Sequence, residues 1–250
     1  MYNKIKTKQE IGYMREGGKI LAEILSELKN KVQPGVSTKY LADYAAKRLR
    51  DFKAEPVTLG YHGFPDVLCV SVNDEVVHGI PKLNYKINDG DLVSLDFVVK
   101  YKGMITDAAI TVGAGKLSSK IQQLINTTEM ALMNGIGTIN GQVRVGDIAN
   151  AVEITLKKAG YGVVEDLVGH GVGHEMHEEP NIPNYGTKGR GILLKPGMTI
   201  AIEPMATMGS HRVYCDNDGW TIKTVDGSLS AHFEHTILIT EQGAEILTLC

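Results

Sequence analysis

The stretch VGHGVGHEMHEEP, residues 168–180, decides how the rest of this chain is interpreted. Its acid–base side chains are three histidines and three glutamates: His170, His174, His177, Glu175, Glu178 and Glu179. Gly169, Gly171 and Gly173 alternate through its first half, which favours an extended, irregular backbone over a helix. Such a backbone passes close to a small ligand while imidazoles point at it, so the stretch indicates a metal site or a proton-relay site. A histidine-rich surface loop is the alternative, and residues elsewhere decide between them.

The composition is that of an ordinary globular protein. Of the 250 residues, 43% are hydrophobic and 22% are charged, which suffices for a sizeable core. The formal net charge of -3 provides no basic surface for nucleic acid or for a membrane. The N-terminus lacks a signal-peptide core, and no apolar run approaches the roughly 20 residues that span a bilayer. Three widely spaced cysteines (Cys69, Cys215, Cys250) argue against a disulfide framework. We therefore expect a cytoplasmic protein.

Hydrophobic periodicity predicts an α+β chain. Helical spacing predicts four helices, over residues 8–30, 38–52, 118–139 and 145–160. Strand patterns occur around residues 67–72, 76–78, 92–99, 104–112, 163, 198–202, 214, 220–224 and 233–239. Because the helix pairs are segregated and the strand signals are antiparallel, we expect an α+β fold rather than a doubly wound one.

A short internal repeat relates two of these strands. INDGDLVSLD (87–96) aligns with LKPGMTIAIE (194–203), and the alignment matches Asp96 to Glu203. Ten positions can match by chance, but a helix-turn-helix pattern precedes the strand in both cases. The repeat predicts two structural halves that each place one carboxylate at an equivalent position.

A predicted β-hairpin brings two further carboxylates together. If its strands turn at Tyr101 and Lys102, Asp96 lies directly opposite Asp107, with Cβ atoms about 4.5–5.5 Å apart. Two aspartates that close among apolar neighbours repel each other, and a bound cation removes this repulsion. The alternative is that one aspartate is protonated or faces solvent.

Three more side chains complete the set of candidate metal ligands. Glu203 and Glu234 lie in apolar strand patterns, and His170 lies between two glycines. Together with Asp96 and Asp107 they can hold two divalent metal ions, and carboxylate-rich sites suit Mn²⁺, Fe²⁺ or Co²⁺ better than a sulfur-bound zinc. Such a pair of ions generates hydroxide near neutral pH.

His78 and His177 are not needed as ligands. Each is followed within three residues by a proline, as expected for a side chain presented at the end of an element. We expect them to donate hydrogen bonds to a substrate carbonyl or to carry protons.

With these residues in place, the chain resembles the methionine aminopeptidases of the bacterial type I class, which are metallopeptidases of the pita-bread fold. The resemblance runs from about residue 5 to the C-terminus. It rests on YHGFP (61–65), SVNDEVVHGIP (71–81), GDLVSLDF (90–97), GHGVGHEMHEEP (169–180), AIEP (201–204) and FEHTI (233–237). The resemblance implies one catalytic domain over residues 1–250, with pseudo-two-fold-related halves at about 1–113 and 114–250 around a curved antiparallel sheet flanked by helices.

The resemblance also implies an activity and the roles of site residues. The activity is removal of the initiator methionine from nascent chains whose second residue is small, by a monomer that works near the ribosomal exit tunnel. The two metal ions, of Co, Mn, Fe or Zn, would be held by Asp96, Asp107, His170, Glu203 and Glu234. Glu203 would be the general base, while His78 and His177 would contact the substrate and steady the intermediate.

The methionine pocket and a cation site follow from the same resemblance. The pocket would be lined by Tyr61, Phe64, Cys69, Met176 and Trp220. Phe64 stands where the family has tyrosine, Met176 where it has phenylalanine, and Thr58 where it often has cysteine, so the pocket stays apolar but its shape changes. Asn73, Glu75 and Ser230 resemble a monovalent-cation site.

Two other readings remain open. Prolidases and aminopeptidases P share the fold and the ligands, but they usually carry an N-terminal domain for which this chain has no room. A non-catalytic binding protein of the same fold would be favoured by loss of a ligand, and all five ligands are present.

Overall fold

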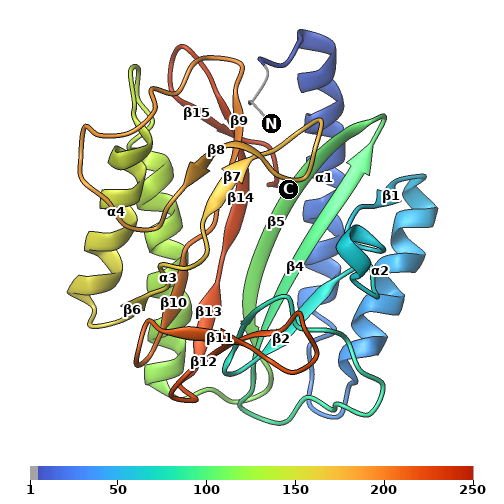
Figure 1. The fold of residues 1–250 in the computed structure, drawn as a ribbon. Helices are drawn as coiled ribbons and strands as arrows, with labels where there is room; N and C mark the ends of the chain where they lie inside the picture. Colours follow the sequence, from blue (N-terminus) through green and yellow to red (C-terminus); the bar gives the residue numbers. More distant parts are fainter. Residues whose placement is uncertain (1–4, 250) are drawn as a thin grey trace.

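The computed structural model describes residues 5–249, which form a curved antiparallel sheet with two small sheets beside it (Figure 1). The large sheet has the strand order β1-β4-β5-β14-β9-β7-β8, with β2 paired to β4 and β15 paired to β14. Its strands are β1 (Glu55–Pro56), β2 (Cys69–Val72), β4 (Leu92–Tyr101), β5 (Met104–Gly113), β7 (Gly169–Gly171), β8 (Glu178–Ile182), β9 (Thr199–Ile202), β14 (Glu234–Ile239) and β15 (Ala244–Ile246).

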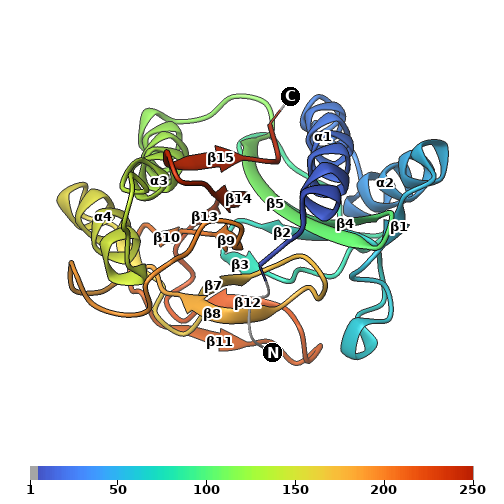
Figure 2. The same ribbon diagram turned by 90° about the horizontal axis from the view of Figure 1, so that it is seen from above.

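The two small sheets each have three strands within the described residues. One has the order β13-β10-β6 and the other β11-β12-β3. Their strands are β3 (Glu75–Val77), β6 (Gly162–Val163), β10 (Met205–Thr207), β11 (Val213–Cys215), β12 (Ile222–Thr224) and β13 (Ser230–His232), and a single 3₁₀ turn, η1, covers Tyr61–Gly63. Figure 2 shows β11 and β12 on the side of the molecule away from α1 (Lys8–Lys29), α2 (Thr38–Phe52) and α3 (Ser119–Gly137).

The long helices of the described residues lie on the other side of the sheet (Figure 2). They are α1, α2, α3 and α4 (Val145–Lys158). The hydroxyls of Thr7, Ser37 and Ser118 accept the N–H groups of the first turns of α1, α2 and α3, which satisfies donors that the helix itself leaves unpaired. The predicted helices and the α+β class are confirmed.

The apolar core is divided between the two helix pairs. Leu21, Leu41 and Phe97 belong to a cluster under α1 and α2, whereas Ile148 and Ile237 belong to a cluster under α3 and α4. Each helix pair thus packs on its own part of the sheet, in keeping with the predicted halves. The division near residue 113 stays a prediction.

The hairpin between β4 and β5 turns at Lys102 and Gly103. Their φ angles are 49° and 86°, and Tyr101 pairs with Met104 as the last pair before the turn. Two consecutive residues with positive φ are typical of a type I′ hairpin, whose twist matches that of the strands. The turn therefore lies one residue farther along the chain than the sequence predicted.

This shift changes the pairing of the two aspartates. Asp96 pairs with Ala109, and Asp107 pairs with Val98, so the prediction that Asp96 lies directly opposite Asp107 is wrong. The displacement is even, so both carboxylates stay on the same face of the sheet as diagonal neighbours. Diagonal neighbours are about 7–8 Å apart at the backbone, which long polar side chains can still bridge through a common ion.

The repeated segments have the same backbone at their turns. Gly90 and Gly197 have φ angles of 89° and 87°, and they precede β4 and β9 respectively. Such φ values favour glycine. The equivalence supports the alignment that matches Asp96 to Glu203.

Two further sequence expectations concern cysteines and membrane spans. Among the described residues, Cys69 is a buried free thiol and Cys215 an exposed one, while Cys250 lies outside the described residues. From residue 5 to residue 249 no helix combines the length and the apolar character needed to cross a bilayer.

Candidate metal centre and active site

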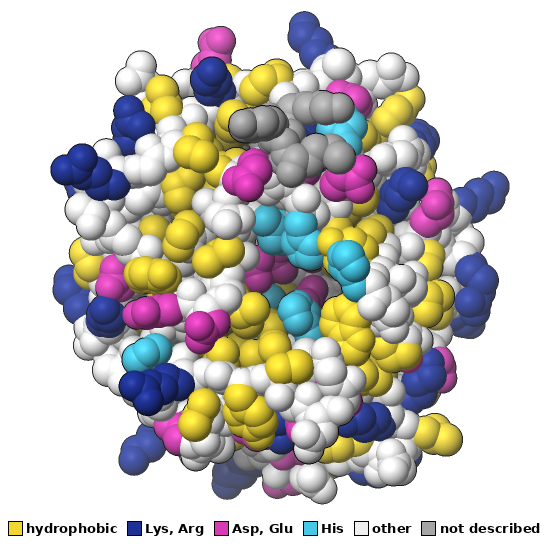
Figure 3. Space-filling view, in the orientation of Figure 1, with side chains coloured by type: hydrophobic (Ala, Val, Ile, Leu, Met, Phe, Trp, Pro, Cys, Tyr) yellow, Lys and Arg dark blue, Asp and Glu magenta, His cyan; other side chains and the backbone are white. Residues whose placement is uncertain are grey.

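One cavity collects the predicted ligands, the two auxiliary histidines and the predicted pocket residues. Its volume is about 100 Å³. Its walls are formed by Thr58, Tyr61, Phe64, Cys69, His78, Asp96, Val98, Asp107, His170, Met176, His177, Glu203, Trp220 and Glu234. Figure 3 shows histidine and acidic side chains around a hollow near the centre of this face.

The ligand candidates come from strands that are neighbours in the large sheet. Asp96 lies on β4, Asp107 on β5 and His170 on β7, Glu234 begins β14, and Glu203 directly follows β9. Since the sheet order is β4-β5-β14-β9-β7, residues far apart in the sequence meet on one face.

A small residue separates two of these carboxylates. Ala109 pairs with Asp96 on one side and with Glu234 on the other. Directly paired residues point to the same face of a sheet, so the methyl group of Ala109 leaves the space between the two carboxylates open.

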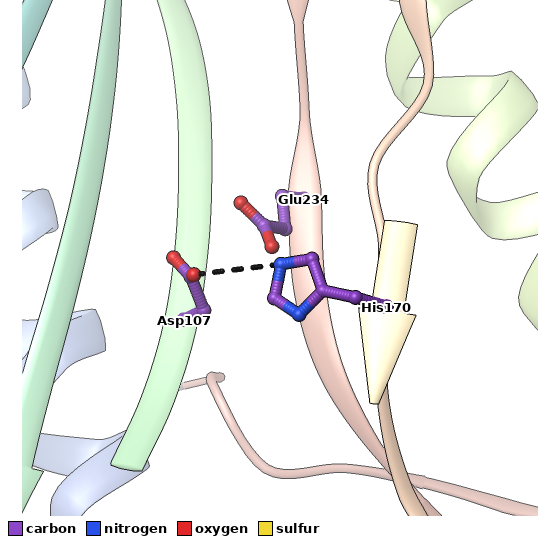
Figure 4. A group of neighbouring side chains, drawn as sticks. All are labelled: Asp107, His170 and Glu234. Atoms are coloured by element: carbon purple, nitrogen blue, oxygen red, sulfur yellow. Dashed lines mark ion pairs between the residues drawn. The ribbon is translucent and has the colours of Figure 1, made fainter. Parts of the chain in front are cut away.

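The imidazole of His170 faces the acidic groups. Its Nε2 atom lies 3.5 Å from Glu203 Oε1 and 4.0 Å from Asp107 Oδ2, and Figure 4 shows the side chains of Asp107, His170 and Glu234 pointing toward one another. The Nδ1 atom lies 2.9 Å from the carbonyl oxygen of Gly171, to which it donates when protonated. That bond leaves the Nε2 lone pair directed at the acidic groups, as a metal ligand requires.

Burial makes the acidic cluster costly without a cation. Asp107 is 4% exposed and Glu234 2% exposed, and Asp107 Oδ1 and Glu234 Oε1 have no hydrogen-bond partner. Burial, followed by repulsion from neighbouring carboxylates, raises the pKa of Asp107, Glu203 and Glu234 well above the ordinary range. Burial also raises the pKa of Asp96. Oxygen-rich ligands, orphaned oxygens and mutual repulsion together fit a site for divalent cations.

The two auxiliary histidines both line the cavity. His78 follows β3 with a φ of 59°, and burial lowers its pKa to about 4. His177 precedes β8, and its ring centroid is 4.4 Å from that of His170. Although His177 as a residue is exposed, burial of its ring and the nearby imidazole of His78 lower its pKa. Both rings are therefore neutral near pH 7.

A hydrogen bond fixes the orientation of His177. The hydroxyl oxygen of Tyr61 lies 2.8 Å from His177 Nδ1. If the hydroxyl donates to Nδ1, the proton of the neutral ring is on Nε2, where it is available to a substrate oxygen.

The apolar part of the cavity is built from aromatic and sulfur-containing side chains. Phe64 and Trp220 meet edge to face, with centroids 5.2 Å apart. Cys69 and Met176 are 4% and 6% exposed, and Cys69 pairs with Asp96 across the sheet. Aromatic rings and sulfur atoms make favourable contacts with a thioether.

The predicted monovalent-cation residues also come together. Ser230 Oγ lies 3.1 Å from the carbonyl oxygens of both Asn73 and Glu75. The carboxylate of Glu75 instead accepts the N–H of Val72 at 2.8 Å, so the backbone of Glu75 faces Ser230.

Sequence reasoning missed two residues here. Val98 lines the cavity, and His232 is buried with Nε2 3.6 Å from Glu203 Oε2. His232 precedes Glu234 by two residues, and this strand spacing was the signal that could have placed both on one face.

Comparisons with known proteins agree with this geometry. The model of metallopeptidase family M24 matches residues 12–241. The chain belongs to this family. A methionine aminopeptidase of Clostridium perfringens is 46% identical over 98% of both chains. A crystal structure of methionine aminopeptidase from Thermotoga maritima superimposes with a TM-score of 0.97 at 44% identity, over 99% of both chains.

The chain is also similar in fold to structures of other peptidases, but at lower sequence identity. A prolidase structure from Pyrococcus furiosus has a TM-score of 0.80 at 23% identity, and the chain covers 66% of it. That similarity shows the fold alone. The full-length matches therefore confirm the pita-bread fold and the resemblance to methionine aminopeptidases, whereas the roles of single residues stay predictions.

Proposed function

We propose that this chain is a metal-dependent methionyl aminopeptidase that removes initiator methionine from nascent polypeptides with a small second residue. The observation that carries the proposal is the single cavity in which acidic side chains, imidazoles and an apolar, sulfur-lined wall meet. The full-length similarity to methionine aminopeptidases supports the same activity.

Two divalent ions would be held by the five predicted ligands: Asp96, Asp107, His170, Glu203 and Glu234. When bound, such ions lower the pKa of water and stabilise negative charge on a reacting carbonyl oxygen. Cobalt, manganese, iron and zinc all remain compatible with this set of oxygen and nitrogen ligands.

The carboxylate of Glu203 is proposed as general base. It takes a proton from the attacking water and delivers it to the amine that leaves when the peptide bond breaks. In the metal-free protein, burial and the charge of Asp96 raise the pKa of this carboxyl group.

The neutral imidazoles of His78 and His177 are proposed to hold the substrate. His177 donates from Nε2 to the carbonyl oxygen as negative charge develops on it, because Tyr61 occupies Nδ1. His78 lines the same cavity and is proposed to donate a second hydrogen bond to the substrate. The methionine side chain fits against Phe64 and Trp220.

Further parts of the proposal rest on the family resemblance. The chain would act as a cytoplasmic monomer on nascent N-termini, near the ribosomal exit tunnel. A monovalent cation would be bound by the carbonyl oxygens of Asn73 and Glu75 and by the hydroxyl of Ser230, which already converge.

Tripeptide hydrolysis tests the activity. Apoprotein reloaded with Mn²⁺, Co²⁺, Fe²⁺ or Zn²⁺ should release methionine from Met-Ala-Ser, but release no residue from Ala-Ala-Ser or Met-Leu-Ser. The Asp107→Asn variant is the control that should lose metal and activity together. No cleavage with any metal, despite two bound ions per chain, would favour a binding protein of the same fold.

A further inference from the structure

His232 is a buried imidazole without a hydrogen-bond partner. It ends β13, two residues before Glu234, and it is 1% exposed. Neither Nδ1 nor Nε2 has a partner. An imidazole that gives up water on both nitrogens loses hydrogen bonds that folding normally replaces, so this position calls for a ligand or an ion.

The ring points at two carboxylates of the metal centre. His232 Nε2 lies 3.6 Å from Glu203 Oε2 and 4.0 Å from Glu234 Oε2. Both separations exceed the roughly 2.7–3.2 Å of a hydrogen bond between nitrogen and oxygen. Ligand atoms that share one ion, each about 2.0–2.2 Å from it, lie roughly 3–4.2 Å from one another. The observed separations match a shared ion better than a direct hydrogen bond.

Two groups of ligand atoms overlap at one residue. Asp107, His170 and Glu234 form one group, and Glu203, His232 and Glu234 form the other, with atoms in each group within 4.8 Å of one another. Each group thus contains one imidazole, and Glu234 belongs to both.

We propose that His232 is a sixth protein ligand of the metal centre, sharing a divalent first-row ion with Glu203 and Glu234. The inference rests on the proposed metal-dependent function, but it adds a residue that the five-ligand set lacks. The ion shared by these three residues would then have a nitrogen ligand as well as oxygen ligands. Such a ligand set favours Co²⁺, Fe²⁺ or Zn²⁺ over Mg²⁺.

The direct test is a crystal structure of the Co²⁺-loaded protein. We expect His232 Nε2 at about 2.1 Å from one of two ions. An ion pair bound by the other ligands, with His232 beyond about 3 Å from both ions, overturns the inference but leaves the proposed function intact. A protein that binds no divalent ion overturns both.

Calorimetric titration with Co²⁺ supplies a second readout. His232→Gln keeps a polar side chain but removes the imidazole, and it should weaken one of the two binding events at least tenfold. The matched control is His235→Gln, which removes a neighbouring imidazole whose Nδ1 lies 2.8 Å from the Thr248 hydroxyl. Equal affinities in His232→Gln and His235→Gln contradict the inference. If His232→Gln does not fold, the crystal structure of the wild-type protein decides.

Discussion

The ammonium group of Lys6 lies 2.6 Å from Glu178 Oε2, and both side chains are buried. The other oxygen of Glu178 accepts the backbone N–H groups of His174 and Glu175 at 2.8 and 3.3 Å. The segment before α1 is thus tied to the loop that presents His177. Burial lowers the pKa of Lys6, and the ion pair with Glu178 opposes that shift.

Removing the Lys6 ammonium should therefore destabilise the protein strongly. In Lys6→Met the carboxylate of Glu178 stays buried without its cation, which costs about 3–5 kcal/mol of the free energy of unfolding. The double variant Lys6→Met/Glu178→Gln should recover part of this loss, since no charge then remains unpaired. Urea unfolding measures both. Lys8→Met, on an exposed side chain, is the control, and a loss of equal size there would contradict a role for the buried pair.

Two glycines of α1 should respond oppositely to alanine. A Cβ at Gly18 would lie 2.1 Å from the carbonyl oxygen of Leu247, whereas a Cβ at Gly12 would have no neighbour within 4 Å. Gly18→Ala should lower the free energy of unfolding by about 1–3 kcal/mol, because the helix must move away from the C-terminal segment. Gly12→Ala should raise it by up to about 1 kcal/mol through helix propensity. Thermal unfolding distinguishes them, and similar shifts in both variants would argue against the close packing of α1.

The sequence predicts some features of the fold and the site but not others. Periodicity located the helices, and the chemistry of buried carboxylates identified Asp96 and Asp107. The pairing of these two residues could not be predicted, because it depends on Lys102 adopting a positive φ next to Gly103. The one-residue error in the turn left both carboxylates on the same face of the sheet, so the predicted ligand set does not depend on it.

Long-range contacts explain what else was missed. In the sequence, His232 is marked only by its spacing of two residues from Glu234. Its proximity to Glu203, which follows β9, depends on how the strands are arranged. Likewise, nothing near Lys6 in the sequence indicates that its ammonium is buried against Glu178. Local patterns predict elements and faces, whereas these partners are set by the order of strands in the sheet.

Metal binding should release protons well above the ordinary pKa of a carboxyl group. Because the pKa values of Asp107, Glu203 and Glu234 are raised in the metal-free protein, a metal ion must displace protons from them. His170, whose pKa is lowered to about 3, is already neutral and releases none. Metal affinity should therefore continue to rise with pH above the ordinary carboxyl pKa of about 4. Calorimetry in two buffers of different ionisation enthalpy counts the protons, and zero release at about pH 5, just above the ordinary carboxyl pKa, would contradict the raised pKa values.

The same shifts set the stability of the metal-free protein. A carboxyl group with a raised pKa in the folded state stabilises it below the ordinary pKa near 4, and this contribution is lost as pH rises through the folded value. His78 acts in the opposite sense, because its folded pKa of about 4 makes stability fall as pH drops from about 6.5 toward 4. The stabilisation by added metal should thus be larger at pH 7.5 than at pH 5.5. Thermal unfolding with and without chelator measures it, and an equal increment at both pH values would speak against proton–metal competition.

Substitution of His177 should separate catalysis from metal binding. His177→Ala removes a proposed hydrogen-bond donor to the substrate oxygen, so kcat should fall by about 10²–10³-fold, as for loss of one oxyanion donor. Tyr61→Phe keeps the imidazole but removes the group 2.8 Å from its Nδ1, and it should lower kcat less. Metal content, measured by elemental analysis, should stay at the wild-type level in both variants, and His211→Ala, on an exposed histidine, should change neither quantity. Loss of metal from His177→Ala would make His177 a ligand and would refute its proposed role, because a group that only steadies the substrate leaves the ions in place.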